Sequence, residues 1–382
     1  IYTLSYTLSL HDALPISMNR TRDISRTGSS RREVLGSLGL AAAGAGLVPL
    51  GLAGSIPATA QGAGSAAATG AGVATKPFGQ PGEKLPVISL GTYLTFDLVP
   101  GADRAHLGEV VKRYYEGGAR VVDTSPLSGT GEVPLGQFAS ALGVTDKLFI
   151  CDKVWSTGDF LADDSHARRS LEQSQLRLWR DKIALVQVHS LTNVDIMLPL
   201  LKAWQKEGRI RYPGVTQHDP AYFDLLAGWI DKAKPDFVQV HYSIFNRKAE
   251  DRVLKAAAAA GTAVLVNMPL EKARLPKLVE GQPLPDFAKE LGITAWSQYF
   301  LKWVVSHPAV TCALPATANP EHAGENIGAL SGPLPDEAMR ARMLKHMETV
   351  PGFADLDKMP WYPGKTYPGI IARARAAMKS RG

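Results

Sequence analysis

Three ionisable residues follow short apolar runs and are of the types that carry out acid–base chemistry. Asp123 ends "ARVVD", Lys153 ends "FICDK" and His189 ends "ALVQVH". A carboxylate and an ammonium group can stabilise each other's charge, and an imidazole titrates near neutral pH. Burying a polar group costs free energy unless the group is paired or takes part in a reaction. The recurrence of ionisable residues at the ends of apolar runs therefore indicates a site for proton transfer.

The surrounding elements must bring these residues together. Short β-rich runs alternate with longer amphipathic segments from residue 84 onward, which indicates right-handed β-α-β units and a parallel sheet. Eight such units in about 250 residues fit a closed (β/α)8 barrel, an α/β fold, better than an open sheet. The expected strands start at Pro86, Ala119, Lys147, Ile183, Ile210, Phe237, Ala263 and Ala309.

In a barrel of this kind the site lies at the carboxyl ends of the strands. Asp123, Lys153 and His189 end the second, third and fourth expected strands, so we expect them at one mouth. Other polar side chains fall at the same level. They include Tyr93, Thr216, Gln217, His218, Gln239, His241, Asn267 and Thr317.

Composition sets the class of protein. The 382 residues are 45% hydrophobic and 20% charged, as expected for a globular core. The net charge of +6 is spread without a clustered basic stripe, so we expect no nucleic-acid partner. Cys151 and Cys312 lie in apolar runs and are interpreted as buried free thiols.

The first 80 residues carry three expected segments. Residues 1–17 resemble translated adapter sequence and receive no functional weight, which makes Met18 the expected start. Residues 18–60 combine arginines, an apolar run and "ATA", and "SRREVL" from Ser30 resembles a twin-arginine export signal. Residues 61–80 are rich in Gly, Ala and Thr, which indicates a flexible linker. We therefore expect the twin-arginine machinery as a partner, a periplasmic or secreted location, and no stable membrane span in the mature chain.

Several motifs beyond Lys76 together resemble the aldo-keto reductase family. They are "GTY" from Gly91, "GGARVVDTSP" from Gly117, "FICDKVW" from Phe149, "VQVHS" from Val186, "EGRIRYPGVTQH" from Glu207, "VQVHYSIFNR" from Val238 and "LPATANPEHAGENIGA" from Leu314. The resemblance places a single-domain barrel over residues 81–335 and a C-terminal helix and tail over 336–382. It implies reduction of a small carbonyl substrate to an alcohol by NADP or NAD.

The resemblance also assigns catalytic positions. Asp123, Lys153 and His189 fall on three of the family's four, while Ser128 in "LSGTGE" occupies the position of the proton-donating Tyr. A serine hydroxyl is shorter and a far weaker acid than a phenol, and loss of a positioned acid costs about 10²–10⁴-fold in rate. His189, Tyr93 or a water could supply the proton instead, or the barrel could have lost its activity.

The cofactor positions depart from the family in part. The usual Lys and Arg on the adenosine 2′-phosphate correspond to Ala316 and His322, so a strong preference for NADPH is doubtful. Tyr93 and Trp155 are assigned to the substrate pocket. The residues that the resemblance assigns to the cofactor are Thr216, Gln217, Gln239, Pro269, Leu270, Pro315, Thr317, His322, Glu325 and Asn326.

Two other classes of function stay open from the residues alone. His189, His241 and His218 with Asp123 could bind zinc or iron in a hydrolase or isomerase, although Lys153 would place a cation beside the metal. We assign no metal site. An exported barrel that binds a nucleotide or other ligand without catalysis is the second alternative. The aromatic, proline-rich tail either folds over the barrel mouth or forms a surface strap that ends in a basic helix.

Overall fold

The computed structural model describes residues 72–156 and 162–380, and its centre is one eight-stranded parallel sheet. The strands follow one another around the sheet in chain order, as expected for successive β-α-β units. They are β3 (Leu90–Gly91), β4 (Val121–Asp123), β5 (Phe149–Val154), β6 (Ile183–Val188), β7 (Ile210–Gln217), β8 (Phe237–His241), β9 (Ala263–Asn267) and β10 (Cys312–Ala313). All eight strands predicted from the sequence are therefore present.

The first and last strands meet and close the sheet into a barrel. Parallel bridges join Ile88 to Ala313 and Gly91 to Ala316. The Ser89 amide donates to the Ala313 carbonyl at 3.0 Å, and the Gly91 amide donates to the Pro315 carbonyl at 3.0 Å. Closure leaves neither edge of the sheet unpaired, and it confirms the predicted α/β barrel.

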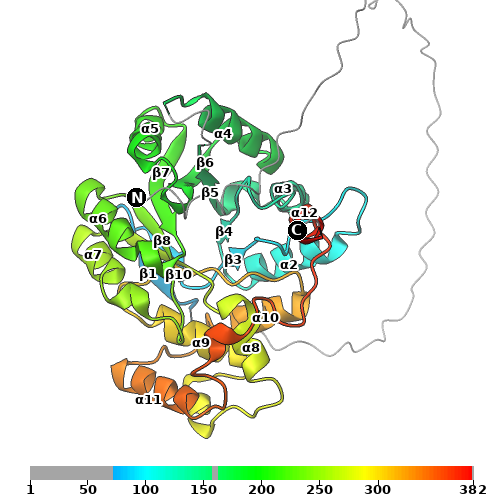
Figure 1. Ribbon diagram of the computed structural model, residues 1–382, viewed down its shortest axis with the longest axis vertical. Helices are drawn as coiled ribbons and strands as arrows, with labels where there is room; N and C mark the ends of the chain where they lie inside the picture. The colour runs from blue at the N-terminus through cyan, green and yellow to red at the C-terminus, as the bar shows by residue number, and fades with distance from the viewer. Residues whose placement is uncertain (1–71, 157–161, 381–382) are drawn as a thin grey trace, which may run out of the picture. The chain divides into compact units, whose positions relative to one another are not determined.

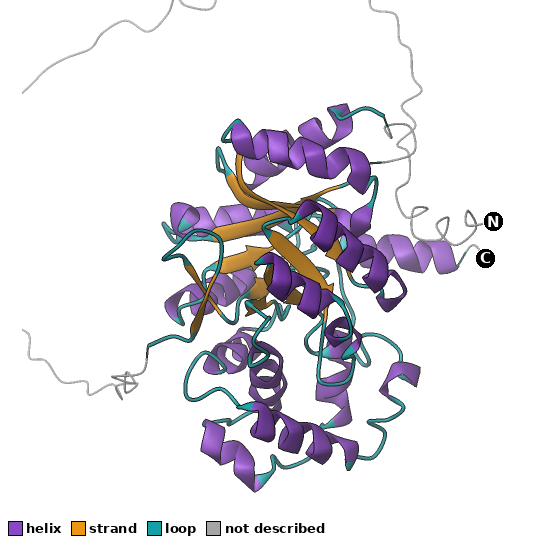
Figure 2. Cartoon of the chain, turned by 90° about the vertical axis from the view of Figure 1, so that its left-hand side faces the viewer, coloured by secondary structure: helices purple, strands orange, loops and turns teal. Residues whose placement is uncertain are grey.

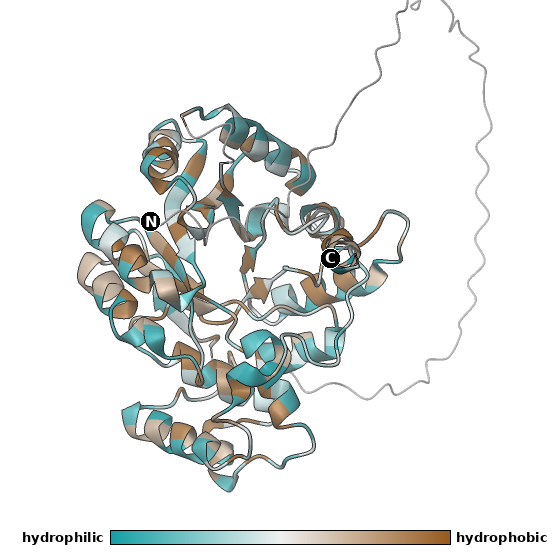
Figure 3. Cartoon of the chain, in the orientation of Figure 1, coloured by the Kyte–Doolittle hydropathy of each residue, from teal (hydrophilic) through white to brown (hydrophobic). Residues whose placement is uncertain are grey.

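Helices lie outside the ring of strands, as Figures 1 and 2 show. Their inner faces and the outer faces of the strands form the main core, and Figure 3 shows hydrophobic residues concentrated along the strands. The helices are α2 (Ala105–Glu116), α3 (Glu132–Ala141), α4 (Ser165–Leu178), α5 (Val194–Lys206), α6 (Phe223–Ala233), α7 (Val253–Ala260), α8 (Arg274–Leu278), α9 (Trp296–Val305), α10 (Pro320–Gly328), α11 (Glu337–Glu348) and α12 (Ile370–Lys379).

A hairpin covers the amino-terminal end of the barrel. Strand β1 (Thr75–Pro77) pairs antiparallel with β2 (Lys84–Pro86), and Phe78 between them packs edge-on against the Tyr212 ring at 5.6 Å. The prediction of a linker over residues 61–80 is wrong for Thr75–Pro77, because pairing and aromatic packing order a stretch whose composition has no strand periodicity. The folded unit thus begins before residue 81.

The C-terminal segment crosses the mouth of the barrel. The Tyr362 amide donates to the Lys272 carbonyl after β9, and the Ile371 amide donates at 2.8 Å to the buried Asp97 carboxylate after β3. The segment thus contacts two loops of the mouth before it ends in a basic helix, so features of both alternatives for the tail are present. Helix α12, drawn in red in Figure 1, has no buried residue.

The expected adapter and export segments lie outside the described residues, as does residue 71 and everything before it. Within residues 72–156 and 162–380, no helix has the length and apolar character needed to cross a bilayer.

Candidate active site

Asp123 and Lys153 form an ion pair at the carboxyl ends of β4 and β5. The sheet register pairs Asp123 with Cys151, so Lys153 lies two residues further along the same face. Its Nζ donates to Asp123 Oδ1 at 2.7 Å and to the Thr124 carbonyl at 2.8 Å. The Lys153 side chain is only 6% exposed, so these bonds offset the cost of burying its charge. An ammonium group has three donors, and one is left for a ligand.

His189 follows β6 and lies next to this pair. Its Nδ1 is 3.4 Å from the Ser125 hydroxyl, and burial together with the Lys153 ammonium lowers the pKa of His189 to about 3. The imidazole is therefore neutral at pH 7, so the near-neutral pKa that made His189 one of the possible proton donors is not found. If Ser125 donates to Nδ1, the proton of the neutral ring is on Nε2, where it can orient a carbonyl oxygen.

A strained turn fixes the position of His189. Ser190, the next residue, has a φ of 52°, which is unusual for a residue with a side chain. Its amide donates to the Thr216 hydroxyl at 2.9 Å, and its carbonyl accepts from Gln217 Nε2 at 3.4 Å. Two of the residues assigned to the cofactor thus also hold the histidine loop.

Ser128 lies on the loop between β4 and α3 and is 4% exposed. Its amide donates to the Ser125 carbonyl at 2.8 Å, within the turn that also presents Ser125 to His189. The next residue, Gly129, has a φ of 66°, and a Cβ there would lie 2.2 Å from Asp97 Oδ1. The glycine is needed both for the turn and for contact with Asp97, whose Oδ1 accepts from the Thr130 amide at 3.0 Å.

Amide side chains line the next part of the mouth. Gln239 Nε2 donates to Asp123 Oδ1 at 2.7 Å, and Gln239 Oε1 accepts from Asn267 Nδ2 at 3.4 Å. The Asn267 Oδ1 atom is buried and has no hydrogen-bond partner among the described residues. A carboxamide N–H placed here would satisfy it, so this side of the mouth fits the polar end of a nicotinamide. Gln217 is less available, since its Oε1 already accepts from two backbone amides.

The residues assigned to the adenosine end of the cofactor differ from one another in burial. Pro315 and Thr317 are buried after β10, whereas His322 and Glu325 are exposed on α10. Asn326 is 2% exposed, and its Nδ2 donates at 3.0 Å to the Tyr114 hydroxyl of α2. The structure therefore gives the Asn326 amide a role in helix packing instead of an open position at the cofactor.

Pro269 and Leu270 begin a strained loop after β9. Met268, Glu271, Lys272 and Ala273 all have a φ between 51° and 69°. This loop brings Lys272 to the mouth, where its Nζ lies 3.1 Å from the centre of the Trp361 ring. Burial and the neighbouring Arg375 lower the pKa of Lys272 to about 8. Lys272 could not be singled out from the residue pattern, because its loop has no regular periodicity.

The candidate metal ligands are used in other ways. His241 Nε2 contacts Glu271 Oε1 at 2.6 Å and His241 Nδ1 contacts Asn246 at 3.1 Å, so both ring nitrogens are engaged. Arg274 also pairs with the other Glu271 oxygen at 2.5 Å. Within the part of the chain that the structure describes, no group of three or more His, Cys, Asp or Glu side chains could hold a metal ion. Cys151 and Cys312 are buried free thiols, as predicted.

The two residues assigned to the substrate pocket follow different strands, Tyr93 after β3 and Trp155 after β5. Tyr93 is 36% exposed beneath the C-terminal segment, with the Arg375 guanidinium 5.9 Å from its ring centre. Trp155 is half-buried and packs edge-on against His166 of α4 at 5.2 Å. A cavity of about 420 Å³ lies beside Trp155.

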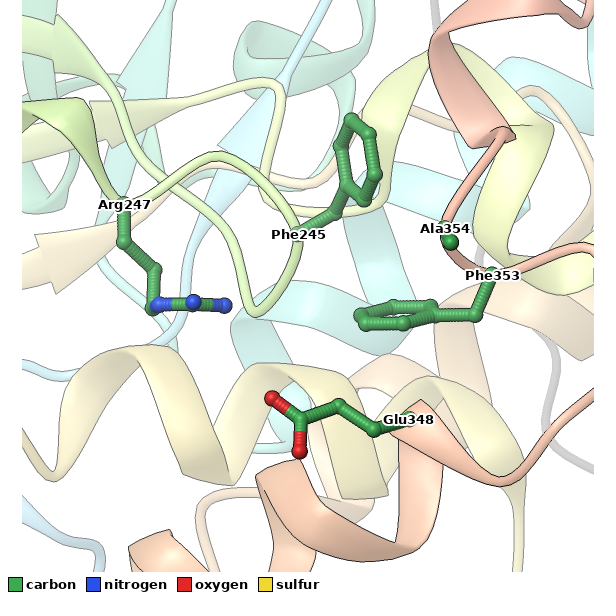
Figure 4. A pocket seen from close by; sticks show the side chains of 5 residues that line it. All are labelled: Phe245, Arg247, Glu348, Phe353 and Ala354. Carbon is green, nitrogen blue, oxygen red and sulfur yellow. The ribbon is translucent and has the colours of Figure 1, made fainter.

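A second cavity, of about 250 Å³, lies between the loop after β8 and the end of α11 (Figure 4). Phe245 and Phe353 meet there edge to face at 5.6 Å, with Arg247 and Glu348 completing the walls. It contains none of the residues predicted for the site. The catalytic candidates are therefore associated with the mouth and not with this cavity.

The ion pair, the neutral histidine and the amides at one barrel mouth agree with a comparison against known families. Residues 87–343 match the model of the aldo/keto reductase family. The chain belongs to the aldo/keto reductase family.

Solved structures of family members have the same fold. An aldo/keto reductase from Klebsiella pneumoniae, in complex with NADP and acetate, is 25% identical with a TM-score of 0.58, and the match covers 69% of this chain and 92% of that one. The thermostable aldo-keto reductase Tm1743, in complex with the inhibitor epalrestat, is 26% identical with a TM-score of 0.59 over 71% of this chain and 99% of that one. The holo form of AKR11C1 from Bacillus halodurans is 17% identical with a TM-score of 0.59 over 72% and 96%, which shows the fold alone.

Ser125 was not predicted as a site residue, and Asn267 was placed at the mouth without a predicted contact to the cofactor. Ser125 lies two residues after Asp123 in "DTSP", and a hydroxyl so close to a predicted catalytic residue is a usable signal. The contact of Ser125 with His189 spans 64 residues of sequence and depends on the pairing of β4 with β5 and of β5 with β6. No local pattern specifies such a contact.

Proposed function

We propose that this family member reduces a carbonyl to an alcohol with a nicotinamide cofactor. The observation that carries the proposal is the Asp123–Lys153 ion pair, with Gln239 on the same carboxylate oxygen and neutral His189 beside it. A bound reduced nicotinamide supplies the hydride. Thr216, Gln239 and Asn267 would hold its carboxamide end, and the loop from Pro269 would lie along its phosphates. NADP in the Klebsiella pneumoniae relative supports this choice of cofactor.

Lys153 is the proton source in this proposal. Two of its three donors are bound to Asp123 and the Thr124 carbonyl, and the third serves the substrate oxygen directly or through a water. His189 binds the same oxygen through Nε2–H without giving up its proton. As the carbonyl carbon gains the hydride, its oxygen takes the proton from Lys153, which is then reprotonated from solvent. Tyr93 is less suited, because it lies under the C-terminal segment at the rim.

Ser128 in place of the family's Tyr makes the reaction slow in this proposal. Introducing Ser128→Tyr puts a phenol at the position that the family resemblance assigns to the proton donor, and it should raise turnover by about 10²–10⁴-fold, the contribution of a positioned acid. The matched control is Ser128→Ala, which should stay within about twofold of wild type because the serine is not the acid. A panel of aldehydes and ketones is assayed with both NADH and NADPH, after fluorescence titration of each cofactor.

The outcomes separate the possible functions. Failure of both cofactors to bind would contradict the oxidoreductase proposal. Binding without turnover in wild type and in Ser128→Tyr would favour the alternative of a ligand-binding barrel.

We also propose export by the twin-arginine route to the periplasm or beyond. The support is the sequence alone, "SRREVL" followed by an apolar run and "ATA". Fractionation of cells that express the full chain should place wild type outside the cytoplasm and retain the Arg31→Lys/Arg32→Lys double variant inside. Equal distribution of the two would contradict the proposal.

A further inference from the structure

One cavity away from the catalytic candidates has opposite charges on its walls. The cavity of about 250 Å³ between the loop after β8 and the end of α11 is lined by Phe245, Arg247, Glu348, Phe353 and Ala354, and it is here called the α11 pocket. Its volume lies just below the range of about 300–1,000 Å³ that is typical of drug-sized ligands, which favours a smaller ligand. The proposed reduction gives none of these residues a role.

Arg247 and Glu348 line the same cavity without pairing with each other. Figure 4 shows the Arg247 guanidinium and the Phe353 ring pointing toward each other, with the Glu348 carboxylate beside the gap between them. Among the described residues the Glu348 carboxylate has no hydrogen bond or ion pair. The Arg247 side chain makes a single hydrogen bond there, from Nη1 to the Ile244 carbonyl at 2.9 Å. The guanidinium therefore keeps donors for a ligand.

The stability of α11 does not explain a carboxylate at Glu348. This residue is the last of the helix, where the negative end of the helix dipole disfavours an anion. Lys345 lies three residues earlier on the same helix, yet no ion pair joins it to Glu348 within the part of the chain that the structure describes. The carboxylate is thus available to a cationic group of a ligand.

The aromatic walls of the α11 pocket are held in place by the fold. Phe353 is 5% exposed and packs edge to face against Phe245 at 5.6 Å. It follows Gly352, whose φ of 84° suits a residue without a side chain, and its amide donates to the Val350 carbonyl at 3.1 Å. On the loop after β8, the Phe245 amide donates to the Ser243 hydroxyl at 3.2 Å. Fixed walls reduce the entropy that is lost when a ligand binds.

We propose that the α11 pocket binds a small zwitterion, a free amino acid with an apolar side chain. The carboxylate of the ligand accepts from Arg247, because a guanidinium and a carboxylate are planar and can form two parallel hydrogen bonds. Its ammonium group donates to Glu348, and its side chain contacts Phe245 and Phe353. A ligand with one charge satisfies one wall and is repelled by the other, which selects for a zwitterion. This site goes beyond the proposed carbonyl reduction and does not depend on it.

Calorimetric titration of the full chain with leucine tests which charges the ligand needs. N-acetylleucine keeps the carboxylate and removes the cation, whereas leucinamide keeps the cation and removes the carboxylate. Each should bind about tenfold or more weakly than leucine, because one charge-assisted hydrogen bond is lost. Glycine should also bind about tenfold more weakly, since it has no apolar side chain to contact the two rings. The comparison uses wild type alone and so does not depend on the folding of a variant.

Single substitutions locate the bound amino acid. Arg247→Gln and Glu348→Gln should each weaken leucine binding by about tenfold or more. The matched controls are Lys248→Gln, at the residue adjacent to Arg247, and Asp355→Asn, whose carboxylate pairs with Lys358 at 2.7 Å. Neither control residue lines the α11 pocket, so both variants should stay within about twofold of wild type. Leucine binding that is unchanged in both Arg247→Gln and Glu348→Gln would place the ligand elsewhere and overturn the proposal.

These titrations need neither cofactor nor turnover, so their outcome is separate from that of the proposed reduction. Leucine binding with the expected dependence on both charges would support the α11 pocket even in a chain that reduced no carbonyl. Absence of leucine binding, or equal binding of leucine, N-acetylleucine and leucinamide, would overturn the pocket and leave carbonyl reduction intact.

Discussion

The two ends of the barrel mouth are built differently. At the ends of β4, β5 and β8, side chains bond to one another: Lys153 donates to Asp123 at 2.7 Å, and Gln239 donates to the same carboxylate oxygen at 2.7 Å. At the end of β10 and the start of α10, Ala316 and His322 are exposed and provide no fixed cation. The reaction end is therefore pre-organised, and the end assigned to the adenosine phosphate is not.

This difference assigns the proposed reaction and the choice of cofactor to different ends of the mouth. Pre-organised dipoles and charges lower the barrier of a reaction because they need no rearrangement when charge develops. Discrimination of a 2′-phosphate needs cationic donors held in place, and the positions that the family resemblance assigns to them, Ala316 and His322, lack such donors. We expect changes at the reaction end to alter turnover and changes at α10 to alter only which cofactor binds.

The largest effect is expected at Lys153. Lys153→Met removes the proposed proton source and leaves Asp123 without its cation, so kcat should fall by about 10²–10⁴-fold. The matched variant Lys153→Arg keeps the charge and should retain part of the activity. Steady-state kinetics measure both. An unchanged kcat in Lys153→Met would contradict this difference between the two ends, because the reaction would then not take place at the hydrogen-bonded end of the mouth.

A smaller effect is expected at the adenosine end. The Ala316→Lys/His322→Arg double variant adds two cations near the expected 2′-phosphate, so the Kd for NADPH should fall by about tenfold. The Kd for NADH and the kcat should stay within about twofold of wild type. Fluorescence titration measures both affinities. Glu321→Gln, which makes α10 less negative without adding a cation, is the control and should discriminate far less.

The smallest effect is a pH dependence of stability from His189. Its pKa in the folded protein is about 3, below the unfolded value near 6.5, so the unfolded chain takes up the proton first as the pH falls. The free energy of unfolding should therefore decrease from pH 6.5 toward pH 3. Allowing for partial solvent exposure, we expect a contribution of about 1 kcal/mol between pH 7 and pH 5.

Urea unfolding of wild type and His189→Asn at pH 7 and pH 5 isolates this contribution. The variant should lose less stability than wild type over that interval. An equal loss would mean that His189 is not held neutral and would reopen its role as the acid.

Local sequence patterns were sufficient to predict the alternating strands and helices of this protein. Runs such as "IALVQVH" and "FVQVHYS" alternate with helical segments, and strand and helix periodicity depends only on neighbouring residues. The eight strands and the positions of Asp123, Lys153 and His189 at strand ends could therefore be predicted. The hairpin of Thr75–Pro77 could not, because its order comes from pairing with β2 and from packing of Phe78 against rings on other strands.

The sequence by itself thus determined the barrel, the family resemblance and which residue types reach the mouth. Only the tertiary structure decided how those residues behave. The low pKa of His189 depends on burial and on Lys153, and the path of the tail depends on Asp97 and Lys272. The cavity of about 420 Å³ beside Trp155 depends on the meeting of one face of α4 with Pro126 and Trp155. The physical reason is that burial and Coulomb interactions depend on distance in space, which the spacing of residues along the chain does not encode.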